Sequence, residues 1–310
     1  MKKSYVTNKH FRGVLNQLGD VLENGEQPPE DLFAEFVNEL KFSNLLIPGI
    51  INGDELEYQY ITYDDGAIIL PLYTDDEEYV KDQNIDGGYN PVPYDILYYK
   101  DALNENGLDG IIINPASECF NIPIDLLNQF PLNSGITFKD NFNGEGYNPE
   151  QLKNIAENTT NDSLVNFIRN PENKENFEGL ISELFKATLL NVFVSDENFE
   201  NFANNGIISL YDVNKFQLVT IAKDNLETLI LFTNKNYIFE GAPEKGKMFY
   251  AYQITVLSKI IEIVLREDMD GILINPNLEN YLIPRHALFN FSSILDNPKF
   301  KQAFDYAFLE

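Results

Sequence analysis

The sequence feature that most constrains this chain is an internal repeat of the segment Asp-Gly-Ile-x-Ile-Asn-Pro. The first copy begins at Asp109 and the second at Asp270. The offset of 161 residues holds without a gap as far as the Ile-Pro pairs that end at Pro123 and Pro284. A match of this length at one fixed offset is typical of duplicated architecture, so the fold is sought as two copies of one module.

Two shorter blocks upstream repeat in the same order. Residues 70–74 match residues 229–233, and the Glu-Leu and Leu-Leu pairs within 39–46 match those within 183–190. The offsets are 159 and 144, so the second copy carries most of its extra length between these two blocks. Three blocks in one order predict a tandem duplication.

The spacing of apolar residues predicts the same succession in each copy: helix, several strands, helix, strand, helix. In the first copy the expected elements are a helix at 32–44, strands at 45–51, 57–62 and 67–73, a helix at 94–104, strands at 111–113 and 119–122, and a helix at 123–129. In the second they are a helix at 177–188, strands near 190–194, 207–211, 216–221 and 227–232, a long helix at 248–266, strands at 271–274 and 280–283, and a helix at 284–293.

Two local features qualify this pattern. Pro71 lies inside an apolar run that otherwise resembles a strand covered on both faces, although proline favours sheet edges and bulges. The pair Asp109-Gly110 predicts a turn in which Gly110 adopts a positive φ.

The predicted fold class is α/β, in the sense of an α+β mixed sheet: two homologous modules, each a mixed β-sheet packed with helices. The expected domains are an N-terminal helical extension at 1–30 with a helix at 8–23, a first module at 31–130, a linker at 131–176 with short helices near 149–157 and 162–169, a second module at 177–295, and a C-terminal helix within 296–310.

A formal net charge of −27 restricts the partners of this chain. Such a field repels phosphate backbones and anionic lipid surfaces, so we expect neither nucleic acid nor a membrane as partner. It attracts basic proteins. A solvated acidic surface without a specific role is the simpler interpretation of the charge itself.

Cysteine and histidine are too rare to build a metal site of the usual kinds. Cys119 is the single cysteine, which excludes an intramolecular disulfide, and His10 and His286 have no second histidine or cysteine nearby in sequence. We therefore expect no metal and no cofactor. The first residues are not followed by an apolar run, and the apolar stretches are strand-sized, which predicts a cytoplasmic protein.

The repeated pattern resembles the SseB-like N-terminal domain family. The features that carry the resemblance are the strands ending at Thr74 and Thr233, the Asp-Gly-Ile-x-Ile-Asn-Pro segment, and the aromatic-x-Ile-Pro segment that starts the next helix. Each copy matches over about 100 residues. The resemblance implies a small α/β domain used as a module, and it carries no catalytic residues over to this chain. Ile124-Asp125 in the first copy stands where the second has Arg285-His286.

Five polar positions are candidates for binding a ligand or partner: Asn114, Thr233, Asn275, Arg285 and His286. The asparagines follow strands, where α/β folds often bind ligands, although an asparagine before a proline more often caps its own turn. Arg285 and His286 start a helix in the second copy alone; a surface pair is the favoured interpretation, because arginine is mostly exposed.

The other short motifs indicate neither a metal site nor a catalytic site. Asp-Asp-Glu-Glu at 75–78 lacks the spacing of a calcium loop and is interpreted as a helix start. The glycine-lysine segment 241–247 lacks the Walker spacing, and no serine-histidine nucleophile motif is recognisable.

Three functions remain open. The favoured one is a non-enzymatic protein-binding or regulatory protein. The second is a small-ligand sensor or enzyme that uses the second module around Thr233, Asn275, Arg285 and His286. The third is an acidic inhibitor or immunity-type protein that binds a basic partner.

Overall fold

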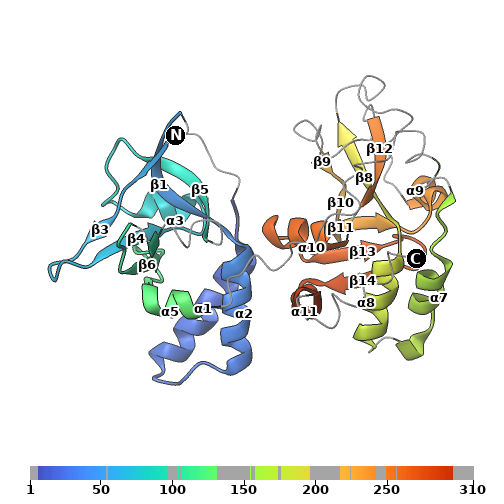
Figure 1. Ribbon diagram of the computed structural model, residues 1–310, viewed down its shortest axis with the longest axis horizontal. Coiled ribbons are helices and arrows are strands. Elements are labelled where there is room, and N and C mark those ends of the chain that lie inside the picture. The colour runs from blue at the N-terminus through green and yellow to red at the C-terminus, as the bar shows by residue number, and fades with distance from the viewer. Residues whose placement is uncertain are drawn as a thin grey trace. The chain divides into compact units, whose positions relative to one another are not determined.

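The computed structural model divides the chain into two compact units, Met1–Ser134 (unit 1) and Gly135–Glu310 (unit 2) (Figure 1). It describes residues 6–53, 55–96, 103–104, 106–130, 154, 158–173, 176–195, 217–223, 225–241, 249–255 and 257–295. The strand expected near 207–211, the helix expected at 298–308 and most of the helix expected near 149–157 lie outside these residues. Both units combine helices with mixed or antiparallel sheets, so the expected α+β class is confirmed.

Unit 1 contains a three-stranded and a four-stranded sheet. In the first, β1 (Asn44–Asn52) lies antiparallel between β2 (Glu55–Tyr58) and β5 (Asn90–Asp95). The second has the order β3 (Ile61–Thr62), β4 (Ile68–Leu72), β6 (Gly110–Ile113) and β7 (Phe120–Pro123). Only the β4–β6 pair is parallel. A bridge between Leu46 and Tyr73, with two N–H···O bonds of 2.8 Å, joins β1 to the chain just after β4.

The described strands of unit 2 form one sheet of seven strands. Its main order is β12 (Phe249–Thr255), β8 (Leu189–Ser195), β11 (Leu226–Phe232), β13 (Gly271–Ile274) and β14 (Tyr281–Pro284). Two short strands pair off this path: β10 (Thr220–Lys223) with β11, and β9 (Gln217–Leu218) with β8. The β11–β13 pair is parallel.

The parallel pairs of the two units have corresponding registers. Leu70 pairs with Ile111 in unit 1, and Leu229 pairs with Ile272 in unit 2. These are the positions that the sequence repeat equates. The bridge from β1 to Tyr73 likewise corresponds to the pairing of Leu190 with Phe232. That the two units descend from one module stays a prediction, which these registers support.

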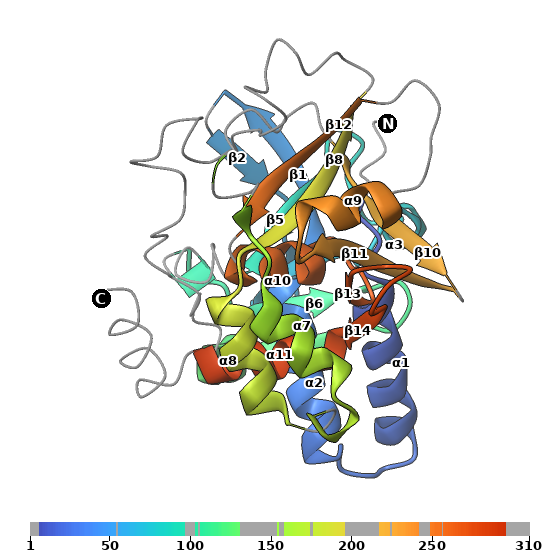
Figure 2. The same cartoon turned by 90° about the vertical axis from the view of Figure 1, so that its right-hand side faces the viewer.

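Helices cover the sheets in each unit, and the following are those whose bounds lie within the described residues. In unit 1 they are α1 (Lys9–Glu23), α2 (Glu30–Phe42), α3 (Asp76–Lys81) and α5 (Ile124–Gln129). In unit 2 they are α7 (Asp162–Arg169), the short η1 (Pro171–Asn173), α8 (Phe177–Lys186), α9 (Lys235–Gly241), α10 (Leu257–Arg266) and α11 (Arg285–Leu295). Within their units, α1 lies beside α2 and α7 beside α8 (Figures 1 and 2).

The unit boundaries differ from the expected domain ranges. The helix of the expected extension at 1–30, α1, places Phe11 and Leu15 fully inside the core of unit 1, against Phe36 of α2. The helix α7, expected within the linker at 131–176, buries Leu164 and Val165 in unit 2. Both helices are integral because their apolar faces complete a core.

The two helices expected after the long strands begin later than the sequence pattern indicates. Residues 94–95 end β5, and residues 249–255 form β12 rather than the first half of a helix at 248–266. Each strand pairs antiparallel with the first long strand of its unit, β1 or β8. This pairing overrides an apolar spacing that fits a helix as well as a strand.

The glycine of the repeated motif is required for close packing in unit 1. A Cβ on Gly110 would lie 2.6 Å from the carbonyl oxygen of Ile122 on the neighbouring strand. Positive φ occurs instead at Gly107, three residues earlier, so the expected turn conformation at Gly110 is wrong. In unit 2, a Cβ on Gly271 would lie 2.2 Å from the carbonyl oxygen of Ile283.

Pro71 occupies a gap in the pairing of β4. On one side β4 pairs with β6 throughout, whereas on the other β3 pairs only with Ile68 and Ile69, and β1 meets the chain again at Tyr73. On this second side, away from β6, Pro71 has no ladder partner among the described strands, so its missing N–H breaks no pairing there. Among the described helices, none is both long and apolar enough to span a membrane.

Candidate functional site

The two repeated asparagines adopt the same backbone conformation in the two units. Asn114 follows β6 and Asn275 follows β13, with φ values of 47° and 48°. Asparagine tolerates this left-handed region better than other residues with a Cβ. Both side chains belong to residues with no exposed surface, so their amide groups need partners inside the protein.

Those partners are supplied by the threonine at the end of the neighbouring parallel strand. In unit 1 the backbone N–H of Thr74 donates to Asn114 Oδ1 at 3.0 Å, and Asn114 Nδ2 donates to Thr74 Oγ1 at 3.0 Å. In unit 2 the same two bonds join Thr233 and Asn275 at 2.9 and 2.8 Å. Each asparagine therefore fastens two parallel strands at their carboxyl ends.

A third asparagine, directly before α1 in unit 1 and before α7 in unit 2, completes the arrangement. Asn8 Nδ2 donates to the carbonyls of Asn44 and Thr74 at 2.7 and 2.8 Å. Asn161 Nδ2 donates to the carbonyls of Thr188 and Thr233 at 2.6 and 2.7 Å. Neither caps its helix by a side-chain bond. We call the group Asn8, Thr74 and Asn114, and its counterpart Asn161, Thr233 and Asn275, the asparagine node.

A glutamate links each asparagine node to charged groups. Asn114 Nδ2 also donates to Glu118 at 2.9 Å, and Asn275 Nδ2 donates to Glu279 at 2.6 Å. An arginine from α1 or α7 reaches each glutamate: Arg12 lies 3.7 Å from Glu118, and Arg169 Nη2 lies 2.5 Å from Glu279.

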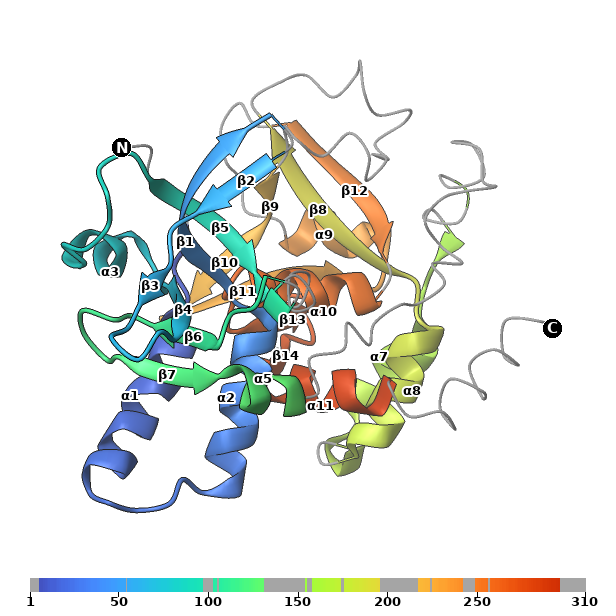
Figure 3. The same cartoon turned by 60° about the vertical axis from the view of Figure 1, so that its left-hand side comes forward.

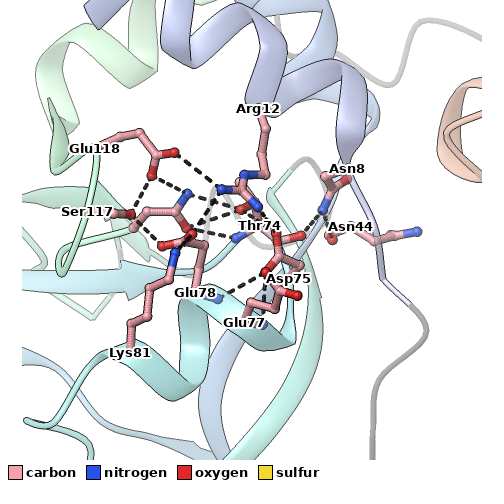
Figure 4. A network of polar contacts seen from close by, with 11 residues as sticks. Asn8, Arg12, Asn44, Thr74, Asp75, Glu77, Glu78, Lys81, Ser117 and Glu118 are labelled. Carbon is pink, nitrogen blue, oxygen red and sulfur yellow. Dashed lines mark hydrogen bonds and ion pairs between the residues drawn. The ribbon is translucent and has the colours of Figure 1, made fainter.

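In unit 1 the arginine is the centre of a larger cluster (Figure 4). Arg12 bonds Asp75 at 2.9 Å and Glu78 at 3.0 Å, in addition to its contact with Glu118. Lys81 Nζ lies 2.5 Å from Glu78 Oε1, the same oxygen that Arg12 Nη2 contacts. The side chain of Glu78 has no exposed surface, so both cations reduce the cost of burying its charge.

Ser117 lies between the two glutamates of this cluster. Its hydroxyl is within hydrogen-bonding distance of Glu78 Oε2 and lies 2.5 Å from Glu118 Oε2. Burial alone would raise the pKa of Glu118, but bonds from Ser117, its own backbone N–H and Asn114, together with the charge of Arg12, hold that pKa below its usual value. The cluster is thus a network of paired charges that holds the node, α1 and α3 together.

The acidic run at 75–78 starts a helix, as its sequence indicates. Asp75 Oδ1 accepts from the backbone N–H groups of Glu77 and Glu78 at 2.9 and 3.0 Å, which caps α3. At the matching place in unit 2, Asn234 accepts from the backbone N–H of Asn236 before α9. Among the described residues, no group of three or more histidine, cysteine, aspartate or glutamate side chains is suited to hold a metal ion.

Arg285 and His286 do not form a pair. The Arg285 guanidinium is buried and donates to the carbonyls of Val264, Leu265 and Met269 at 2.9 to 3.2 Å, around the end of α10. His286 is exposed. The favoured interpretation as a surface pair is therefore wrong for Arg285, which satisfies helix-end carbonyls that lack partners within the helix. This use of the guanidinium also leaves no shared Arg-His site.

The sequence indicated the asparagines and Thr233 as candidates, but not the residues that bond to them. Asn8 and Arg12 come from a segment with no motif of its own, and Glu78 belongs to the acidic run at 75–78, which was interpreted as a helix start alone. Glu118 and Glu279 both lie inside the gap-free repeat, 161 residues apart like the other matched positions. A search of the repeat for matched carboxylates would therefore have found them.

Comparisons with known proteins give no relative. Neither the models of known families, nor the curated proteins, nor the solved structures include a match to this chain.

Proposed function

We propose that this chain is a non-enzymatic protein-binding or regulatory protein that acts in the cytoplasm, built of two tandem SseB-like units. The observation that carries the proposal is the internal use of the polar groups at the strand ends. An α/β enzyme presents its chemistry at such ends, whereas here Asn114, Asn275 and Thr233 bond to the fold itself.

The asparagine node serves stability in this proposal, since its buried amides hold strands and a helix at fixed positions. A rigid scaffold that is acidic overall, with a formal net charge of −27, favours recognition of other proteins through its surface. The resemblance to SseB-like domains supports the same use as a module.

The test is capture followed by reconstitution. The full chain serves as bait, and an unrelated acidic protein of equal net charge serves as control, because polyanions retain basic proteins without specificity. We expect at least one protein to bind the chain and not the control, and to bind again when purified, with a Kd of about 10 μM or tighter.

Two results would count against this function. One is failure of every captured protein to bind again in purified form. The other is turnover of a small molecule by the chain that disappears on substitution of His286, an exposed residue whose replacement is expected to leave the fold intact.

A further inference from the structure

A group of tyrosines and carboxylates gathers beside the edge strand β2 of unit 1. The rings of Tyr58 and Tyr60 meet edge to face, with centroids 5.7 Å apart, and Tyr60 is 49% exposed. From the chain that leads into β5, the hydroxyl of Tyr89 donates to Glu57 of β2 at 3.3 Å. We call Glu57, Tyr58, Tyr60, Asp86 and Tyr89 the tyrosine surface.

The tyrosine surface is held in place by its neighbours. Gln59 Nε2 donates to the carbonyl of Asn84 at 2.9 Å, and Gln59 Oε1 accepts from the backbone N–H of Asp86 at 2.9 Å. These bonds tie the segment before β5 to the end of β2. Tyr58 packs partly against the core of unit 1. Tyrosines fixed in this way lose little conformational entropy when a partner binds.

The charged residues nearest to this surface in the sequence are almost all acidic. Residues 44–96 contain twelve aspartates and glutamates, no arginine and one lysine, Lys81. That lysine bonds Glu78 in the Arg12 cluster. Desolvation, followed by the charges of Glu57 and Asp86, raises the pKa of the Tyr89 hydroxyl, as expected where negative groups converge.

The backbone beside the tyrosine surface is also open to a partner. β2 ends the order β2-β1-β5, so within the described part of unit 1 its outer edge pairs with no strand. An exposed edge can bond an extended segment of another chain. Tyrosine is among the residues that most often dominate the energy of a protein interface.

We propose that the tyrosine surface binds an arginine-containing segment of a basic protein. A guanidinium stacks on an aromatic ring and bonds a carboxylate with two parallel N–H groups, whereas an ammonium does neither as well. Glu57 and the exposed ring of Tyr60 supply both kinds of contact. This inference rests on the proposed function and specifies the chemistry of its partner.

The test uses ten-residue peptides in which serine alternates with arginine, lysine or glutamate, titrated against the full chain by fluorescence anisotropy at low salt. We expect the arginine peptide to bind at least threefold more tightly than the lysine peptide, and the glutamate peptide not to bind. Rising salt weakens the binding of both basic peptides.

Matched variants locate the binding. We expect Tyr60→Ser and Glu57→Gln each to weaken the affinity for the arginine peptide threefold or more. Leu22→Ser and Glu23→Gln, at exposed positions of α1, leave its affinity unchanged. Within unit 1, α1 and β2 lie at opposite ends (Figures 2 and 3). These controls therefore remove one exposed apolar side chain and one negative charge far from the tyrosine surface.

The proposal is overturned if arginine and lysine peptides bind equally and Tyr60→Ser changes neither, because diffuse charge then explains the binding. It is also overturned if no basic peptide binds. Failure of the surface and failure of the function are distinguishable. A reconstituted partner that binds Tyr60→Ser normally rejects the surface alone, and arginine-peptide binding without any protein partner rejects the function alone.

Discussion

The two units keep the same asparagine node and surround it differently. In unit 1, Arg12 contacts three carboxylates and its side chain is 30% exposed; in unit 2, Arg169 bonds Glu279 and is 58% exposed. The bonds from the asparagines to backbone groups are the same in both. The comparison indicates that the node holds the fold, whereas the charges around it can change without changing the fold.

The helix after the repeated strands shows a second difference. Arg285 at the start of α11 reaches the carbonyls around the end of α10, and the matching residue at the start of α5 is Ile124. Arg285 therefore binds helix-end carbonyls in unit 2, whereas the isoleucine at the matching position of unit 1 has no group that could form such bonds.

The largest expected effect is loss of a node asparagine. We expect Asn114→Ala and Asn275→Ala each to lower the free energy of unfolding of its own unit by about 4 kcal/mol, from lost bonds, unpaired buried groups and a left-handed backbone. Urea unfolding followed by hydrogen exchange and mass spectrometry reports on each unit separately.

The control for this prediction is Asn114→Gly. Glycine accepts a φ of 47° and also lacks the amide, so it should recover about 1 kcal/mol of the loss and no more. Equal stability of the alanine variant and the native chain would show that the node does not hold the strands.

A smaller effect is expected at the cap of α10. Arg285→Ile places the residue type of unit 1 into unit 2, leaves the carbonyls of Val264, Leu265 and Met269 without the guanidinium, and costs about 2 to 3 kcal/mol. His286→Ala, next in sequence and exposed, should be neutral. If both variants unfold at the native urea midpoint, the guanidinium bonds contribute nothing to stability.

The loss of stability on replacing Arg12 or Arg169 is expected to be smaller again. Arg12→Met leaves three carboxylates without their shared cation and should cost about 1 to 2 kcal/mol. Arg169→Met should shift the melting temperature of unit 2 by less than Arg12→Met shifts that of unit 1. Thermal unfolding followed by hydrogen exchange compares the two; a reversed order would contradict the difference drawn between the units.

The smallest effect concerns pH. Because the folded protein holds the pKa of Glu118 below its usual value, the charged group stabilises unit 1 above about pH 4.5, and this contribution is lost as pH falls further through the folded pKa. Glu118→Gln should make the stability of unit 1 less dependent on pH between about 5 and 3. Urea midpoints across this range measure the change, and identical slopes would reject it.

Most of the central strands could be predicted from the sequence, because each is a short apolar run that ends at a turn residue. The repeat equates Leu70 with Leu229 and Ile111 with Ile272, but which strands pair, and in which register, comes from the structure. The strands at 94–95 and 249–255 could not be separated from the helices after them, because an apolar run crosses from one element into the next without a break.

The candidate site was only half predictable. Asn114 and Asn275 are visible in the motif, but their meaning depends on Thr74 and Thr233, forty and forty-two residues away, and on α1 and α7. The burial of Arg285 was not predictable from its charge, because the carbonyls that receive it belong to another helix. Such contacts depend on tertiary packing rather than on local pattern.

Native-state hydrogen exchange of the backbone amides of Thr74 and Thr233, followed by NMR, tests the central claim most directly. If the node is structural, both amides exchange only through unfolding of their own units, with protection equal to that of the central strand residues Leu70 and Leu229. Exchange of either amide at the rate of an open turn would show that its asparagine is free to serve a ligand, and would contradict the account.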